Sequence, residues 1–114
     1  EALRVLLTAR QGAIVARTKA IGQLKALIVN APQALREQMR RGSTNDQLER
    51  GGSRLRTLPT HSVEHRTTVR GIRAVARRAL FLEAEAAEHE SAIEELVMTI
   101  CPSLLELPGG VGGP

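Results

Sequence analysis

The chain has 114 residues and a formal net charge of +4, a length that suits one small domain. Its only cysteine, Cys101, excludes an internal disulfide framework, and no apolar run approaches the roughly 20 residues that span a bilayer, so a cytoplasmic protein is expected. Phe81 is the only aromatic residue among many Leu, Ile, Val, Ala, Arg and Glu residues, which predicts an all-α protein of long helices with narrow contact seams.

The first predicted element is a long helix over residues 1–29. Apolar residues recur there every seven positions, at Leu7, Ile14, Ile21 and Ile28, and no proline interrupts them. This spacing predicts one apolar face on a helix about 43 Å long, at 1.5 Å per residue. Pro32 ends the helix, because the residue before a proline avoids the helical region.

Residues 30–61 are predicted to hold short helices and a loop. Pro32 suits the first position of a helix that continues to about Arg41 and is closed by Gly42. Ser43 and Thr44 are candidate caps of a further short helix, with Asp46 or Gln47 at the third position after the cap. Residues 51–61 are then expected to form a loop with a helical fragment at Arg54–Leu58.

The strongest periodicity lies in residues 62–101. One set recurs every seven residues and a companion set follows it three residues on: Ile72, Ala79, Ala86, Ile93 and Ile100, with Val75, Leu82, His89 and Leu96. This pattern predicts a coiled-coil helix that Pro102 stops. Its apolar stripe needs a partner, either the first helix folded back or a second copy of the chain.

Charge separates along the sequence. Residues 1–41 carry +6, residues 42–78 carry +5, and residues 79–114 carry −7. Folding back antiparallel would place the acidic residues Glu83 to Glu95 beside Arg4, Arg10 and Arg17. Exposed ion pairs contribute only about 0–1 kcal/mol each, so they select orientation more than they stabilise. We therefore expect a long antiparallel helical hairpin, or coiled coil, with further dimerisation as a possibility; parallel pairing stays open.

Four arginines share one face of the long predicted helix. Arg66, Arg70, Arg73 and Arg77 follow one another at spacings of four, three and four. They form either a ridge that contacts phosphates or an ordinary solvated face.

No catalytic or metal site is predicted from these residues. His61 and His65 have the spacing of two metal ligands on a helix, but no third ligand is evident. The carboxylates from Glu83 to Glu95 lie along one extended helix, where they do not converge on a cleft.

Residues 102–114 have a different character. Leu104-Leu105-Glu106-Leu107-Pro108-Gly109 and the following glycines are typical of the start of a helix-hairpin-helix segment. That motif needs a second helix, so the segment is expected to be truncated; a plain glycine tail is the alternative.

Several stretches together resemble one protein family. They are Leu3-Arg4-Val5-Leu6-Leu7, Ala16-Arg17-Thr18-Lys19-Ala20-Ile21 followed by Gln23-Leu24-Lys25-Ala26-Leu27, Ala31-Pro32 with Leu35-Arg36, His65-Arg66-Thr67-Thr68-Val69-Arg70, Ala76-Arg77-Arg78 and Leu104-Leu105-Glu106-Leu107-Pro108-Gly109. In this order they resemble the bacterial insertion-sequence transposases of the one-ten family, which have a RuvC-like DEDD domain and are bridge-RNA-guided recombinases. Gly22, where that family usually has Asn, and the extra glycines after Pro108 depart from its pattern.

The resemblance implies that the chain is a fragment, the coiled-coil arm between the two catalytic domains. The family's acidic ligands and nucleophilic serine match no residue here, so no cofactor is expected in this chain, although the intact family implies a divalent ion such as magnesium. The expected partners are DNA, structured RNA and other copies of the chain. The nucleic-acid-binding residues that we predict are Arg17, Lys19, Arg66, Arg70, Arg73 and Arg77.

Two function classes follow from the sequence. The first is a helical arm that binds nucleic acid and assembles protomers in DNA transposition. The second is a structural coiled-coil oligomerisation module that does not contact nucleic acid. A small helical enzyme is disfavoured, because no reactive side chains converge.

Overall fold

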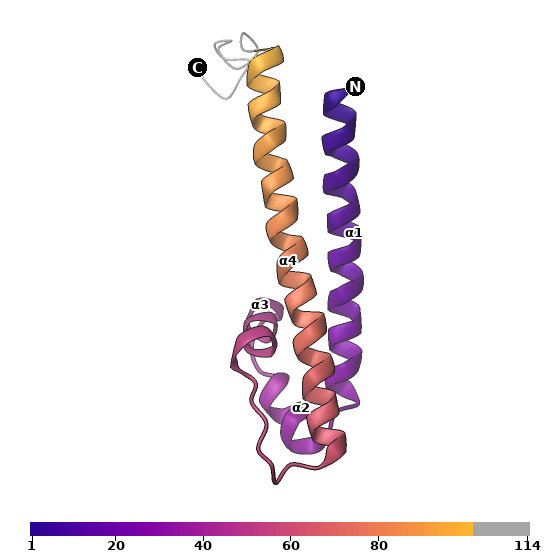
Figure 1. Ribbon diagram of the computed structural model, residues 1–114, viewed down its shortest axis with the longest axis vertical. Coiled ribbons are helices and arrows are strands. Elements are labelled where there is room, and N and C mark those ends of the chain that lie inside the picture. The colour runs from indigo at the N-terminus through magenta and orange to yellow at the C-terminus, as the bar shows by residue number, and fades with distance from the viewer. Residues whose placement is uncertain (102–114) are drawn as a thin grey trace.

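The computed structural model describes residues 1–101, which form helices and no strand. The elements are α1 (Ala2–Val29), α2 (Gln33–Met39), α3 (Thr44–Glu49), a π-helical turn η1 (Arg50–Arg54) and α4 (Val63–Ile100). α1 and α4 run in opposite directions side by side, so the N-terminus and the end of α4 lie at the same end (Figure 1). The predicted all-α antiparallel hairpin with short intervening helices is confirmed. The hairpin segment predicted at 102–114 lies outside the described residues.

Two ion pairs define the register between the long helices. Arg10 Nε lies 3.7 Å from Glu90 Oε2, and Arg17 Nη2 lies 3.4 Å from Glu83 Oε2. From the first pair to the second, the residue number rises by seven on α1 and falls by seven on α4, as in an antiparallel helix pair. The expected pairing of the basic first helix with the acidic part of α4 is confirmed at these two arginines, whereas Arg4 forms no ion pair within residues 1–101.

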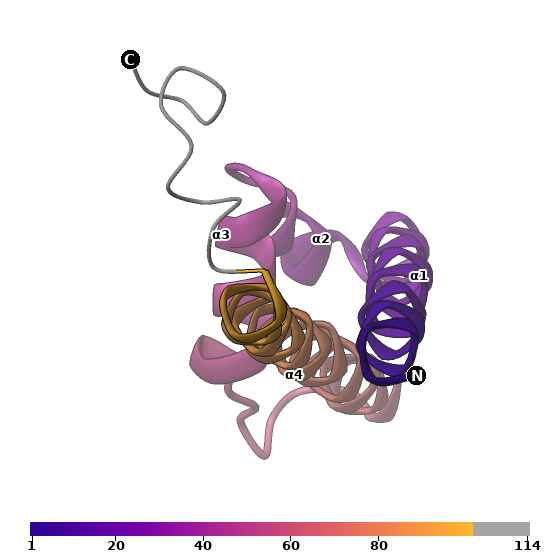
Figure 2. The same cartoon turned by 90° about the horizontal axis from the view of Figure 1, so that it is seen from above.

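The buried core lies at the closed end of the hairpin, where α2 and α3 cover one side of the helix pair (Figures 1 and 2). It contains residues from every helix: Ala20, Leu24, Ile28, Ala31, Leu35, Met39, Leu48, Leu55, Val69, Ile72, Ala76 and Ala79. All are aliphatic or methionine, and Phe81 is 69% exposed. Burial of these side chains supplies the main stabilisation of the closed end.

At the open end of the hairpin, the described residues form only two helices, α1 and α4. Before Ala20, only Ala13 is buried, and no residue of α4 after Ala79 is buried. The predicted seam residues Ala86, His89, Ile93 and Leu96 are half-buried there. None of the helices within residues 1–101 has both the length and the apolar character of a membrane span.

Polar side chains connect the short helices to the hairpin. The buried Gln47 accepts a hydrogen bond from Lys25 Nζ (2.8 Å) and donates one to the Arg40 carbonyl (3.2 Å). Arg50 Nη1 donates to the carbonyls of Gln38, Met39 and Arg41 at 3.1–3.3 Å. A cation at the last carbonyls of a helix is favourable, so Arg50 closes α2.

The segment between α3 and α4 differs from the prediction. A helical fragment was expected at Arg54–Leu58, but the helical turn is Arg50–Arg54 and residues 55–58 have no regular structure. The physical reason is packing: the glycines Gly51 and Gly52 are buried against α4, and Leu55 turns into the core at 1% exposure. Smaller differences occur at α2, where Pro32 precedes the helix as its cap and Met39 ends it.

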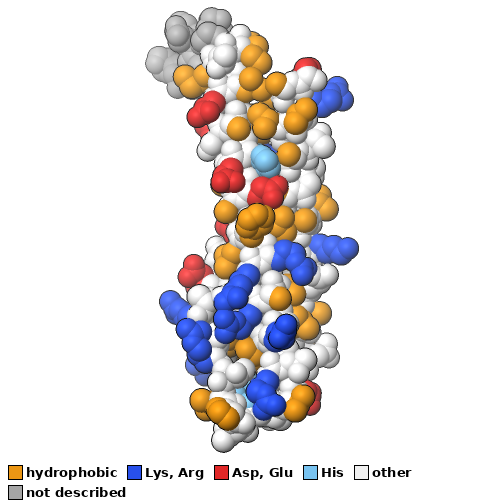
Figure 3. Space-filling view, in the orientation of Figure 1, with side chains coloured by type: hydrophobic (Ala, Val, Ile, Leu, Met, Phe, Trp, Pro, Cys, Tyr) orange, Lys and Arg blue, Asp and Glu red, His pale blue; other side chains and the backbone are white. Residues whose placement is uncertain are grey.

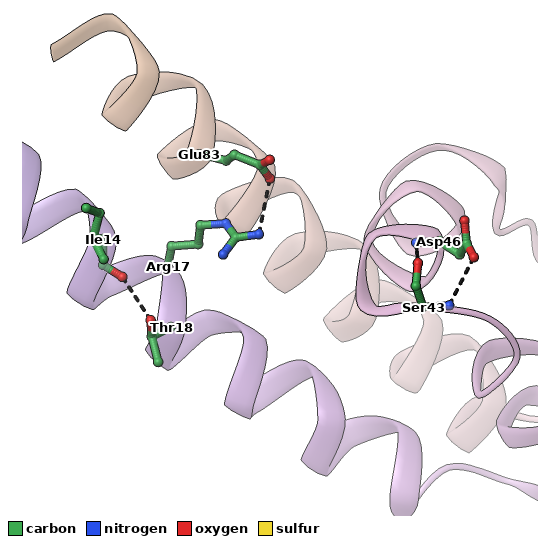
Figure 4. Close-up of polar contacts among 6 residues, drawn as sticks. All are labelled: Ile14, Arg17, Thr18, Ser43, Asp46 and Glu83. Carbon is green, nitrogen blue, oxygen red and sulfur yellow. Dashed lines mark hydrogen bonds and ion pairs between the residues drawn. The ribbon is translucent and has the colours of Figure 1, made fainter. Parts of the chain in front are cut away.

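The start of α3 is a reciprocal cap (Figure 4). The Asp46 N–H donates to Ser43 Oγ (3.2 Å), and the Ser43 N–H donates to Asp46 Oδ2 (3.0 Å), which confirms the predicted cap with Asp46 at its third position. Hydrogen bonds from the backbone and hydroxyl of Ser43, helped by the charges of Arg50 and Arg54, lower the pKa of Asp46 below 3.8. The ionised carboxylate is therefore favoured by the folded state.

This cap predicts a dependence of stability on acidity. A carboxyl group with a lowered folded pKa adds stability that is fully present above pH 3.8 and is lost as pH falls through the folded value. We expect Asp46→Asn to be less stable than the wild type near pH 6 and to approach it in strong acid. Denaturant unfolding curves of both proteins at several pH values measure this. A stability difference that stays constant across the series would contradict it.

Two glycines inside α1 predict stabilising substitutions. Gly12 and Gly22 lie within the helix, and a Cβ built at either meets no atom within 4 Å. Alanine has the higher helix propensity, so Gly12→Ala and Gly22→Ala should each raise the free energy of unfolding by about 0.5–1 kcal/mol. Thermal and denaturant unfolding measure the change. Gly42→Ala is the control, and it should destabilise, because Gly42 has a φ of +81°.

Candidate nucleic-acid interface

The four predicted arginines of α4 lie along one groove. Arg66, Arg70, Arg73 and Arg77 line an open hollow of about 590 Å³, together with Thr57 and three small or apolar residues of α4. We call this hollow the arginine groove. Among residues 1–101 no acidic side chain lines it. The helical spacing of four, three and four that predicted a common face is therefore a real juxtaposition in the fold.

Backbone carbonyls hold three of these arginines in place. Arg73 Nη1 donates to the Leu55 carbonyl (3.1 Å), and Arg77 Nε donates to the Gly52 carbonyl (3.0 Å). Arg66 donates to the carbonyl of His61. A carbonyl orients a guanidinium group without neutralising its charge, so these cations keep free N–H donors for an anion. Ordered side chains also lose less entropy when a ligand binds.

The two predicted residues of α1 lie apart from the groove. Arg17 forms the ion pair with Glu83, the first carboxylate in the second half of α4 (Figure 4). Lys19 is exposed on α1, and neither residue lines the arginine groove. The structure thus brings four of the six predicted residues together and places Arg17 against a carboxylate.

Charge is divided between the two ends of the molecule. Lys and Arg side chains gather over the lower part of the face in Figure 3, whereas acidic side chains are concentrated toward its upper part. The arginines of the groove lie in the first half of α4, and all six of its carboxylates after Glu64 lie in the second half. An extended phosphate ligand is therefore attracted to the closed end and repelled from the open end.

The two histidines near the groove stack on each other. Their ring centroids are 3.9 Å apart, and His61 Nδ1 accepts a hydrogen bond from the Leu58 N–H (3.0 Å). Burial, with a smaller effect of the neighbouring His61, lowers the pKa of His65 below 6.5. Within residues 1–101 no three His, Cys, Asp or Glu side chains gather as metal ligands would. The hydrogen bond between Leu58 and His61 closes the turn that precedes α4.

Sequence reasoning missed the residues that support the groove. The carbonyls of Gly52 and Leu55 hold Arg77 and Arg73, and Arg50 anchors the turn that presents them. The paired glycines at 51–52 were a usable signal, because a glycine inside a helical segment often marks a close backbone approach. The residues that these glycines approach belong to α4. The sequence does not show this contact, because α4 lies far along the chain from the glycines.

Comparisons with known proteins identify no relative of this chain. No family model, no curated protein and no solved structure matches it. No function is therefore transferred from another protein, and what the groove binds must be inferred from its own residues.

Proposed function

We propose that this chain is a helical arm that binds nucleic acid through the arginine groove and serves in DNA transposition. The observation that carries the proposal is the gathering of four arginines along one groove that, in the part of the chain that the structure describes, no acidic side chain lines. Phosphate backbones are bound mainly by Arg and Lys side chains, which release counterions when they do so. Three of the guanidinium groups are already ordered by carbonyls, which favours binding of an anion.

The assignment to transposition rests on the resemblance of the sequence to the insertion-sequence transposases of the one-ten family. In that family the matching region is an arm that lies between the catalytic domains. The proposal gives this chain no catalytic step, because no residue matches the family's acidic ligands or its serine. Its proposed roles are to contact DNA or structured RNA and to join protomers. A purely structural coiled coil would have the second role alone.

The test compares two double variants with equal loss of charge. Arg66→Gln/Arg70→Gln removes two cations from the groove, and Arg4→Gln/Arg10→Gln removes two from the open end of the hairpin. We expect duplex DNA or structured RNA to bind the wild type at low salt. The groove variant should lose about tenfold or more in affinity, and its slope of log affinity against log salt should fall by about two.

The control and the contradicting outcomes are distinct. Arg4→Gln/Arg10→Gln should keep most of the wild-type affinity, because neither residue lines the groove. Equal losses in both variants would indicate attraction to net charge without a site. No binding by the wild type at low salt would contradict the proposal and favour the structural module. Circular dichroism of each protein shows that the helices are retained.

A further inference from the structure

α4 has a second heptad stripe on the surface that α1, α2 and α3 leave exposed. Its members alternate at spacings of four and three residues, and every one is exposed. In the first half they are Arg70, Ala74, Arg77 and Phe81. In the second half they are Ala84, Glu88, Ser91 and Glu95. We call this set the outer stripe. It is separate from the seam that packs against α1.

The outer stripe is antisymmetric in charge about its centre. Its two arginines lie in the first half, its two glutamates in the second half, and Phe81 and Ala84 lie in the middle. Glu95 lies as many residues after the midpoint of the stripe as Arg70 lies before it. The same holds for Glu88 and Arg77. A helix with such a face is complementary to an antiparallel copy of itself.

We propose that a second copy of this chain packs its α4 antiparallel along the outer stripe. In that register Arg70 lies opposite Glu95 of the second copy, Arg77 lies opposite Glu88, and Phe81 lies against Ala84. The alternating spacing matches an antiparallel coiled coil, in which the two classes of seam position face each other. A two-fold axis repeats each contact, as expected of a closed homodimer.

The side chains favour this partner and this direction. Phe81, at 69% exposure, is the only aromatic residue of the chain and lies at the centre of the stripe. Burial of an aromatic ring is a common anchor of an interface, and the small residues Ala74, Ala84 and Ser91 allow a close approach. A parallel pairing would set arginine against arginine and glutamate against glutamate, so charge selects the antiparallel dimer.

The same two arginines also line the arginine groove. Arg77 contacts the Gly52 carbonyl through Nε alone, which leaves its terminal nitrogens for a carboxylate. The dimer deepens the protomer-joining role of the proposed function and rests on it, but it does not depend on nucleic-acid binding. If nucleic acid binds the groove, both ligands use Arg70 and Arg77. The dimer is therefore measured without nucleic acid, so that failure of nucleic-acid binding and failure of self-association are separate results.

Charge reversal tests the pairing. Sedimentation velocity and light scattering of the full chain at low salt should show a monomer–dimer equilibrium that weakens at high salt. Arg70→Glu/Arg77→Glu and Glu88→Arg/Glu95→Arg should each raise the dissociation constant about tenfold or more, because each places like charges opposite each other. An equal mixture of the two variants should associate as a heterodimer, since opposite charges face each other again.

Three outcomes would overturn the proposal: a wild type that stays monomeric, reversal variants that dimerise as the wild type does, and a mixture that stays monomeric. Circular dichroism shows whether each variant folds. If Arg70→Glu/Arg77→Glu unfolds, Glu88→Arg/Glu95→Arg still tests the pairing, because it alters only exposed side chains. The register is checked by mixing Ala74→Cys and Ser91→Cys chains in a Cys101→Ser background. Oxidation should cross-link the mixture more than either variant alone, and a dimer formed through the half-buried seam would not do so.

Discussion

Replacing Ile72 with alanine is expected to lower the free energy of unfolding by about 2–4 kcal/mol. The side chain is 0% exposed and belongs to the core at the closed end of the hairpin. Removing three of its carbons loses their transfer free energy and leaves a cavity that tightly packed neighbours fill poorly. Urea unfolding followed by circular dichroism measures the change as a shift in midpoint at constant slope.

Ile93→Ala is the matched control for this prediction. Ile93 occupies the same position of the predicted seam three heptads later, so the sequence pattern treats the two isoleucines as equivalent. It is only half-buried, since within residues 1–101 α1 alone packs along the seam at the open end and no third helix covers it. Its replacement should cost about 1 kcal/mol, because less apolar surface returns to water. Equal losses at Ile72 and Ile93 would show that the open end is buried as deeply as the closed end.

The difference in burial between Ile72 and Ile93 separates the features of the fold that the sequence predicts from those that it does not. Heptad spacing and proline positions located both long helices to within about a residue, and segregated charge indicated their antiparallel direction. Depth of burial along the seam could not be predicted, because it depends on where α2 and α3 fold back. Leu35, Met39 and Leu48 bury the closed end, and no periodicity in such short segments shows which half of a long helix they will cover.

The candidate site shows the same division. Spacing alone placed Arg66, Arg70, Arg73 and Arg77 on one helical face, because three and four residues complete nearly one turn. It could not predict the carbonyls that orient them, since those belong to an irregular segment whose path is set by tertiary contacts. Segregated charge, by contrast, did predict the surroundings of Arg17: it lies beside Glu83, although that carboxylate is 66 residues away in sequence.

Replacing Gly51 with alanine is expected to lower the free energy of unfolding by about 1–2 kcal/mol. A Cβ at this position would lie 3.1 Å from the Ala76 Cβ and from Ile72 Cγ2. Neither neighbour moves freely, because the alanine is fixed to α4 and the isoleucine is fully buried. Crowding of a packed core costs about 1–3 kcal/mol, which exceeds the gain of about 0.5–1 kcal/mol from removing a flexible glycine.

Gly22→Ala is the direct control. It should change the free energy of unfolding in the opposite direction, because the same methyl group enters open space on α1. Gly52→Ala should fall between the two, since the nearest atom to its Cβ is the end of the flexible Leu80 side chain, at 3.1 Å. The three variants measured together by denaturant unfolding separate packing from backbone entropy. If Gly51→Ala matched Gly22→Ala, η1 would not pack against α4. The carbonyls that orient Arg73 and Arg77 would then lose their support, so the order of these three stabilities also tests the arginine groove.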